Sequence, residues 1–169
     1  MGQYYLAVFL AEDGKFIRAF VDPHSYSHGA KLTEHSYVGT TFMDAVEFML
    51  SPQGIFYKSR VIWAGDYADP EESGDNLYTI ARQAEDKLVF LEKRTEYRFI
   101  LNHTKKLFIN KDALGDIHPL AILTVEGNGR GGGDYYGSDE ELCGSWARDI
   151  ISVESSDNGY IEFISGFGK

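Results

Sequence analysis

The chain has 169 residues, of which 43% are hydrophobic and 25% charged, so it can bury a core without disulfides and is too hydrophobic to remain disordered. Its formal net charge of −10 argues against binding to nucleic-acid backbones or anionic membranes, and it suits either a basic protein partner or simple solubility. A single cysteine, Cys143, excludes an intramolecular disulfide. With no signal peptide and no apolar run of membrane-spanning length, we expect a cytoplasmic protein.

Two aromatic and β-branched segments near the beginning predict a β-hairpin. They are Tyr4–Ala11 and Lys15–Val21, and an Asp-Gly turn separates them. Residues 24–39 read as an irregular loop rich in Ser, His, Tyr and Gly. Thr41 is then expected to cap a helix at about 42–50, which ends before a Ser-Pro pair.

The remainder of the chain predicts more strands and a second helix. A short strand at Arg60–Ala64 precedes an acidic loop and a helix near 76–86. Further strands are expected at 88–91, 97–101, 107–110, 120–125, 150–153 and 160–164. We therefore predict a single domain over residues 1–169 of the α+β class, a mainly antiparallel sheet with two short helices packed on it.

An internal similarity predicts a duplication covering about 4–69 and 97–153. Both stretches read as an aromatic strand, a polar turn with lysine and an aromatic-Ile strand, and Trp63-Ala-Gly-Asp is echoed by Trp146-Ala-Arg-Asp. We expect two diverged strand-hairpin-strand units around a pseudo-two-fold axis, in one sheet or in two packed sheets. Both tryptophans are expected to be core residues.

The most unusual segment is a glycine-rich stretch at residues 126–134. Its exposed backbone amides, with one arginine, suit a phosphate or carboxylate; the alternative is a flexible or strained surface loop. No Gly-Lys-Ser/Thr follows, so it is not a P-loop. The residues predicted to bind a ligand are Gly129, Arg130, Gly131, Gly132, Asp134 and Tyr136.

Two other sets of residues suggest acid–base or metal chemistry. Asp66 and Asp149 each follow a tryptophan, and symmetric units would bring them together as an acid pair; alternatively, each binds a turn at a strand end. His24, His28 and His35 fall in one loop and are the candidate metal ligands, although loop histidines usually only form hydrogen bonds. No cofactor is predicted.

Several segments together resemble an uncharacterised family of small bacterial and phage-associated proteins. The resemblance rests on MGQYY, WAGDYAD, NHTKK and GNGRGGGD, which begin at residues 1, 63, 102 and 127, and on the Gly-Ser-Trp-Ala that begins at residue 144. It covers most of the chain. It implies no activity and transfers no site residue.

Three functions fit these patterns. We expect a non-enzymatic binding protein that engages a basic protein or a small phosphorylated ligand, by analogy with acidic proteins of bacterial and phage conflict. The alternative is a metal- or anion-dependent enzyme acting on a nucleotide-like substrate, with Arg130 and loop amides holding the anion and Asp66, Asp149 or His118 moving protons or binding a metal. A structural, oligomer-forming subunit is the third.

Overall fold

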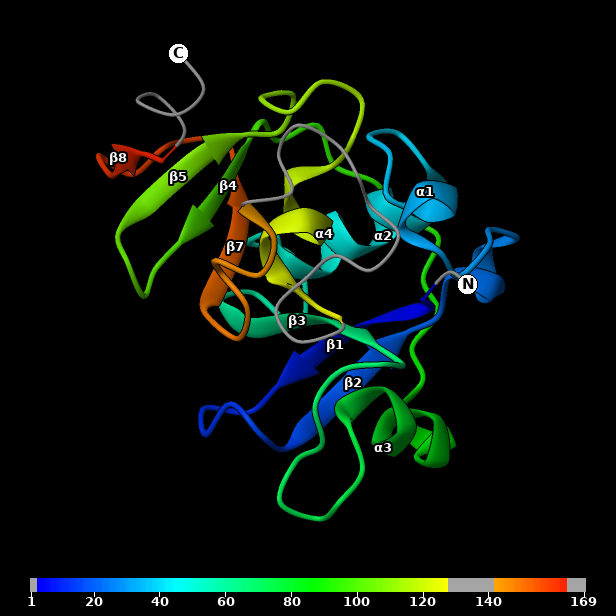
Figure 1. The fold of residues 1–169 in the computed structure, drawn as a ribbon. Helices are drawn as coiled ribbons and strands as arrows, with labels where there is room; N and C mark the ends of the chain where they lie inside the picture. The colour runs from blue at the N-terminus through cyan, green and yellow to red at the C-terminus, as the bar shows by residue number, and fades with distance from the viewer. Residues whose placement is uncertain (1–2, 128–141, 164–169) are drawn as a thin grey trace.

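A mainly antiparallel sheet forms the centre of the fold (Figure 1). The computed structural model describes residues 3–127 and 142–163, and within these ranges the sheet has eight strands. The strands are β1 (Tyr5–Leu10), β2 (Ile17–Val21), β3 (Ser59–Gly65), β4 (Phe99–Asn102), β5 (Leu107–Asn110), β6 (Val125–Glu126), β7 (Ile150–Glu154) and β8 (Ile161–Glu162). The helices are η1 (Pro23–Tyr26), α1 (Leu32–His35), α2 (Thr41–Leu50), α3 (Leu77–Gln83), η2 (Glu85–Lys87) and α4 (Pro119–Thr124).

The order of the strands has an approximate two-fold symmetry. Along the sheet the order is β2-β1-β3-β7-β4-β5-β8, and β6 pairs with β3 off this path. The antiparallel strands β3 and β7 lie side by side in the middle, and each is flanked by an antiparallel hairpin. Two units, each with a hairpin, a helix and a third strand, would produce this arrangement about an axis between β3 and β7. The duplication itself stays a prediction from the sequence.

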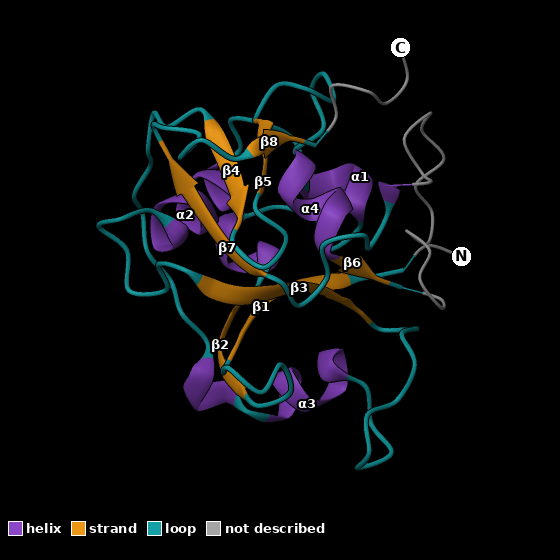
Figure 2. Cartoon of the chain, turned by 90° about the vertical axis from the view of Figure 1, so that its left-hand side faces the viewer, coloured by secondary structure: helices purple, strands orange, loops and turns teal. Residues whose placement is uncertain are grey.

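Strand β1 is buried on both faces of the sheet and divides the core in two. Alternate side chains of a strand point to opposite faces. Tyr5, Ala7 and Phe9 belong to the larger hydrophobic cluster with α2 and α4, whereas Leu6, Val8 and Leu10 belong to a smaller cluster with α3. Figure 2 shows α2 and α4 on one side of β1 and β3, and α3 on the other.

The predicted fold class is confirmed, as are the first hairpin and both longer helices. The structure is α+β, with a mainly antiparallel sheet and the helices α2 and α3 close to their predicted positions. The cap of α2 lies one residue earlier than expected, because the Thr40 hydroxyl accepts the hydrogen bond from the Met43 amide at 3.2 Å. Asn76 caps α3 in the same way.

Two strand predictions are wrong, and a third strand is shorter than expected. Residues 120–125 are mostly helix α4, because Pro119 suits the first helical position and His118 Nδ1 accepts the Leu120 amide. Residues 88–91 pair with β2 only at a single bridge between Leu88 and Phe20, and they do not form a strand. The last expected strand is reduced to the two residues of β8 within the described part of the chain.

Both tryptophans are fully buried in the larger cluster, as expected of core residues. They do not occupy equivalent places, however. Trp63 lies within β3, whereas Trp146 lies in the turn that precedes β7. The repeated Trp-Ala-x-Asp pattern therefore does not mark symmetric positions.

Candidate functional site

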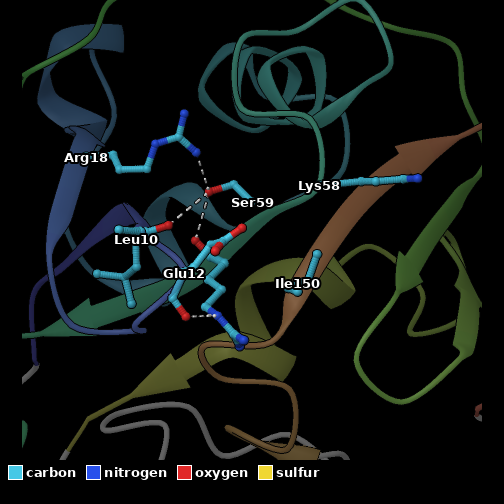
Figure 3. A pocket seen from close by; sticks show the side chains of 8 residues that line it. Leu10, Glu12, Arg18, Lys58, Ser59 and Ile150 are labelled. Atoms are coloured by element: carbon cyan, nitrogen blue, oxygen red, sulfur yellow. Dashed lines mark hydrogen bonds between the residues drawn. The ribbon is translucent and has the colours of Figure 1, made fainter.

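A pocket of about 350 Å³ lies where β1 ends and β3 begins, and basic residues dominate its polar walls (Figure 3). Its size is at the lower end of the range for small-ligand sites. It is lined by Leu10, Ala11, Glu12, Arg18, Lys58, Ser59, Arg60 and Ile150. We call it the basic pocket.

The turn of the first hairpin forms one edge of the basic pocket. Asp13 Oδ1 accepts hydrogen bonds from the amides of Lys15 and Phe16, both at 2.9 Å, which lowers the pKa of Asp13. Gly14 has a φ of 70°, a conformation that glycine adopts at little cost. The Ala11 amide donates to the Phe16 carbonyl at 2.8 Å and closes the turn. The Asp-Gly pair therefore fixes the backbone from which Glu12 and Arg18 project.

Both arginines of the basic pocket are held by neutral groups. Arg60 donates from Nε to the Glu12 carbonyl and from Nη1 to the Arg148 carbonyl, each at 2.9 Å. Arg18 donates to the Ser59 hydroxyl at 3.5 Å, and its guanidinium lies 5.1 Å from the centre of the Phe56 ring. The two positive charges are thus positioned without being neutralised.

The third cation, Lys58, lies at the rim of the basic pocket. Figure 3 shows Arg18 on one side of Ser59 and Lys58 on the other, with the Lys58 ammonium directed away from Arg18. That ammonium lies 5.3 Å from the centre of the Tyr57 ring. Lys58 has a φ of 58°, in the left-handed region that lysine rarely adopts.

Ser59 offers a hydroxyl that is only weakly engaged. Its Oγ lies 3.2 Å from the Arg60 carbonyl, 3.4 Å from the Leu10 carbonyl and 3.5 Å from Arg18. All three distances are long for bonds that involve a hydroxyl oxygen. Ser59 is only 3% exposed, so a ligand can reach this hydroxyl only from within the basic pocket that Ser59 lines.

None of the three cations forms an ion pair with any described residue, although the chain as a whole carries a net charge of −10. The other charged residue that lines the basic pocket is Glu12. The local charge is therefore opposite in sign to that of the whole chain.

Arg148 provides a comparison within the molecule. Like Lys58, it has a positive φ, 69°, and lies just before one of the two central strands. It forms bidentate contacts with Glu71 and with Glu126, at 2.8 to 3.1 Å. Burial alone would lower the pKa of Arg148, but these carboxylates outweigh it and raise the pKa. Arg148 is thus neutralised by carboxylates, whereas Lys58 has no ion pair with any described residue.

A chain of hydrogen bonds lies beside Lys58 and resembles a nucleophile–base pair. His103 Nε2 is 2.7 Å from Ser152 Oγ, which donates to Glu154 at 2.7 Å. Burial, and then Lys58, lower the pKa of His103. Ser152 is fully buried, and no substrate can reach its oxygen. We therefore interpret these contacts as structural.

The structure does not bring the predicted acid pair together. Asp66 follows the last residue of β3, and its Oδ1 accepts the Tyr4 amide at 3.0 Å. Asp149 lies near the other end of β3, where its carbonyl accepts the Val61 amide. Its carboxylate binds Asn102 and Lys105. Each aspartate fixes a strand end, which was the alternative role.

The three loop histidines each contact different partners. His35 is fully buried, and its Nδ1 contacts the Gly29 carbonyl at 3.0 Å while Nε2 accepts the indole N–H of Trp63 at 3.0 Å. His28 contacts the Thr41 hydroxyl, and His24 lies 3.8 Å from Asp22. Residues 3–127 and 142–163 contain no group of three His, Cys, Asp or Glu that could hold a metal ion.

The ligand site predicted from the glycine-rich segment lies outside the described residues, since Gly129, Arg130, Gly131, Gly132, Asp134 and Tyr136 all fall within 128–141. Sequence reasoning missed the basic pocket. Arg18 is far along the chain from Lys58 and Arg60, and the three cations belong to no motif. The usable signals were the Asp-Gly turn and the Lys-Ser-Arg sequence at residues 58–60.

No family model, curated protein or solved structure matches this chain. Across the parts of the chain that the structure describes, no helix has the length and apolar character needed to cross a membrane.

Proposed function

We propose that this protein is a non-enzymatic binding protein and that its ligand is a small phosphorylated molecule held in the basic pocket. The observation that carries the proposal is that Arg18, Lys58 and Arg60 line one pocket and have no ion-pair partner among the described residues. Guanidinium groups bind phosphate oxygens with two parallel hydrogen bonds, and such bonds are among the strongest in proteins.

A phosphate group matches these donors better than a carboxylate does. It offers three acceptor oxygens and up to two negative charges. Arg18 on β2, and the Ser59 hydroxyl and Arg60 on β3, supply donors from the two strands that flank β1, and Lys58 adds an ammonium at the rim. A carboxylate would leave part of this set unused.

The net charge of the protein sets the conditions under which binding is observed. A chain of charge −10 repels anions at long range, whereas local cations attract them within a Debye length of about 10 Å at 0.1 M salt. Salt at about 0.1 M screens the long-range repulsion more than the short contacts inside the pocket, so binding should be measured at that salt concentration. The basic protein partner and the cytoplasmic location both remain predictions from the sequence.

Calorimetric titration with inorganic pyrophosphate tests the proposal. Arg18→Gln removes one guanidinium from the pocket, and the exposed Arg94→Gln is the matched control that lies elsewhere. We expect Arg18→Gln to weaken binding about fivefold, since each charge-assisted contact contributes about 1 kcal/mol at a partly exposed site. Arg94→Gln should leave the affinity unchanged. Equal losses in the two variants, or no heat of binding in the unmodified protein, would contradict the proposal.

A further inference from the structure

A second pocket, of about 650 Å³, lies at the opposite end of β1 from the basic pocket. Its lining includes two tyrosines, Tyr4 and Tyr78, and two cations, Lys31 and Arg82. Tyr4, the residue before β1, is 45% exposed. We call it the tyrosine pocket.

The walls of the tyrosine pocket are tied together through Asp66. Asp66 accepts the Tyr4 amide through Oδ1 and donates its own amide to the Tyr4 carbonyl, both at 3.0 Å. Its carbonyl accepts the side-chain amide of Asn76, the N-cap of α3, at 2.9 Å. Helix α3 carries Tyr78 and Arg82. One aspartate therefore fixes both tyrosine-bearing walls.

The third wall is the segment from Gly29 to Glu34. It is attached to β1 by the hydrogen bond from the Tyr5 amide to the Ala30 carbonyl at 2.9 Å. The Glu34 carboxylate lies over Gly29, where an added Cβ would overlap it, and it accepts the Lys31 amide at 3.0 Å. The Glu34 carboxylate is thus engaged by the Lys31 backbone amide.

The cations of the tyrosine pocket remain available to an anion. Lys31 has no ion pair with any described residue. Arg82 lies 3.6 Å from Asp22 and 5.8 Å from the centre of the Tyr78 ring, so it is positioned beside an aromatic surface and only partly neutralised. An aromatic ring next to a guanidinium offers stacking and hydrogen bonding to one ligand.

We propose that the tyrosine pocket is a separate site for a ligand that joins a planar aromatic ring to one anionic group, of the chemical class of the nucleoside monophosphates. The ring packs against Tyr4 and Tyr78, and the phosphate contacts Lys31 and Arg82. This site is independent of the basic pocket, because it shares no lining residue with it.

Calorimetric titration of the full chain with adenosine 5′-monophosphate, adenosine and ribose 5-phosphate tests the assignment. The monophosphate should bind at least tenfold more tightly than either fragment, because only it uses both the ring and the phosphate contacts. Equal binding of ribose 5-phosphate and the monophosphate would overturn the role of the tyrosines. No binding of the monophosphate at millimolar concentration would overturn the site.

Matched variants locate the binding. Tyr4→Leu should weaken the monophosphate about tenfold, whereas Tyr37→Leu, at another exposed tyrosine, should not. Lys31→Gln should weaken it about fivefold and Lys93→Gln should not. Arg18→Gln, in the basic pocket, should have no effect. Loss of monophosphate binding in Arg18→Gln with none in Tyr4→Leu would move the ligand to the basic pocket and contradict this inference while leaving the proposed function intact.

Discussion

Nε2 of His118 lies 2.7 Å from Oε2 of Glu47, and both side chains are fully buried. His118 Nδ1 accepts the Leu120 amide, so the proton on Nε2 is donated to Glu47. The other carboxylate oxygen accepts from Lys111 at 3.0 Å and from the Thr95 hydroxyl at 3.2 Å. One buried carboxylate thus joins α2, the start of α4, the end of β5 and the segment before β4.

Glu47→Gln tests the importance of this buried carboxylate for stability. The variant leaves Lys111 without its counter-ion and weakens two other contacts, and we expect the free energy of unfolding to fall by about 2–4 kcal/mol. Urea denaturation at pH 7 measures the loss. The exposed Glu92→Gln is the control and should change stability by less than about 0.5 kcal/mol. A loss no larger than that of Glu92→Gln would contradict the structural role.

The pKa of Glu47 predicts that the stability of the fold decreases in acid. Burial alone would raise the pKa of Glu47, but the hydrogen bond from His118 and the charge of Lys111 outweigh it and hold the pKa below its ordinary 4.5. The unfolded chain therefore binds this proton first as pH falls. The contribution of Glu47 is fully present above about pH 4.5 and is lost as pH falls through the lower folded value.

The burial of His35 predicts a second dependence of stability on pH, at higher pH than that of Glu47. Burial lowers its pKa from 6.5 to about 4 and outweighs the contact of Nδ1 with the Gly29 carbonyl, which raises the pKa. Nε2 of the neutral ring accepts the Trp63 indole N–H. Between these values the unfolded chain binds a proton that the folded chain does not. Stability should therefore fall, on the order of 2–3 kcal/mol, as pH drops from 6.5 to 4.

Proton NMR titration of the His35 ring checks this prediction directly. The ring should remain neutral until about pH 4, whereas a midpoint near 6.5 would show that burial does not control it. His35→Leu should remove this part of the pH dependence. It should also cost about 1–3 kcal/mol at pH 7, because the Trp63 N–H loses its acceptor.

Lys58→Gly separates stability from ligand binding. Glycine adopts a φ of 58° at little cost, so the variant should be as stable as the unmodified protein or up to about 1 kcal/mol more stable. It should nevertheless bind pyrophosphate about threefold more weakly, because a cation has been removed from the rim of the basic pocket.

Lys106→Gly is the matched control for Lys58→Gly. Lys106 has a φ of 60° and lies outside the basic pocket. Thermal unfolding and pyrophosphate titration of both variants provide the comparison. Both should show a similar change in stability, but only Lys58→Gly should lose affinity. A loss of affinity in both would mean that net charge, and not the pocket, controls binding.

The sequence was sufficient for the fold class because its local signals agree with the tertiary structure. The Asp13-Gly14 turn fixes the first hairpin, and Thr40 and Asn76 each cap a helix. It failed at residues 120–125, where a short apolar run fits a buried strand as well as a buried helix and Pro119 decides the outcome. The prediction of a strand at 88–91 failed because the Leu91 amide donates to the Tyr26 hydroxyl and not to a neighbouring strand.

The candidate site could not be predicted in the same way. Arg18 lies in β2, Arg60 in β3 and Lys58 in the turn before it, and only the pairing of β1 with both strands brings them together. Their lack of carboxylate partners is likewise a property of the folded chain. Asp66 and Asp149 share a sequence pattern that predicted a pair, but the folded chain holds them near opposite ends of β3.

A two-dimensional amide NMR titration of the full chain with inorganic pyrophosphate, at about 0.1 M salt, shows where the ligand binds. We expect dose-dependent shifts at Arg18, Lys58, Ser59 and Ile150, with little change at Tyr4 or Tyr78. Shifts confined to other parts of the chain, or no shifts at millimolar pyrophosphate, would contradict binding in the basic pocket.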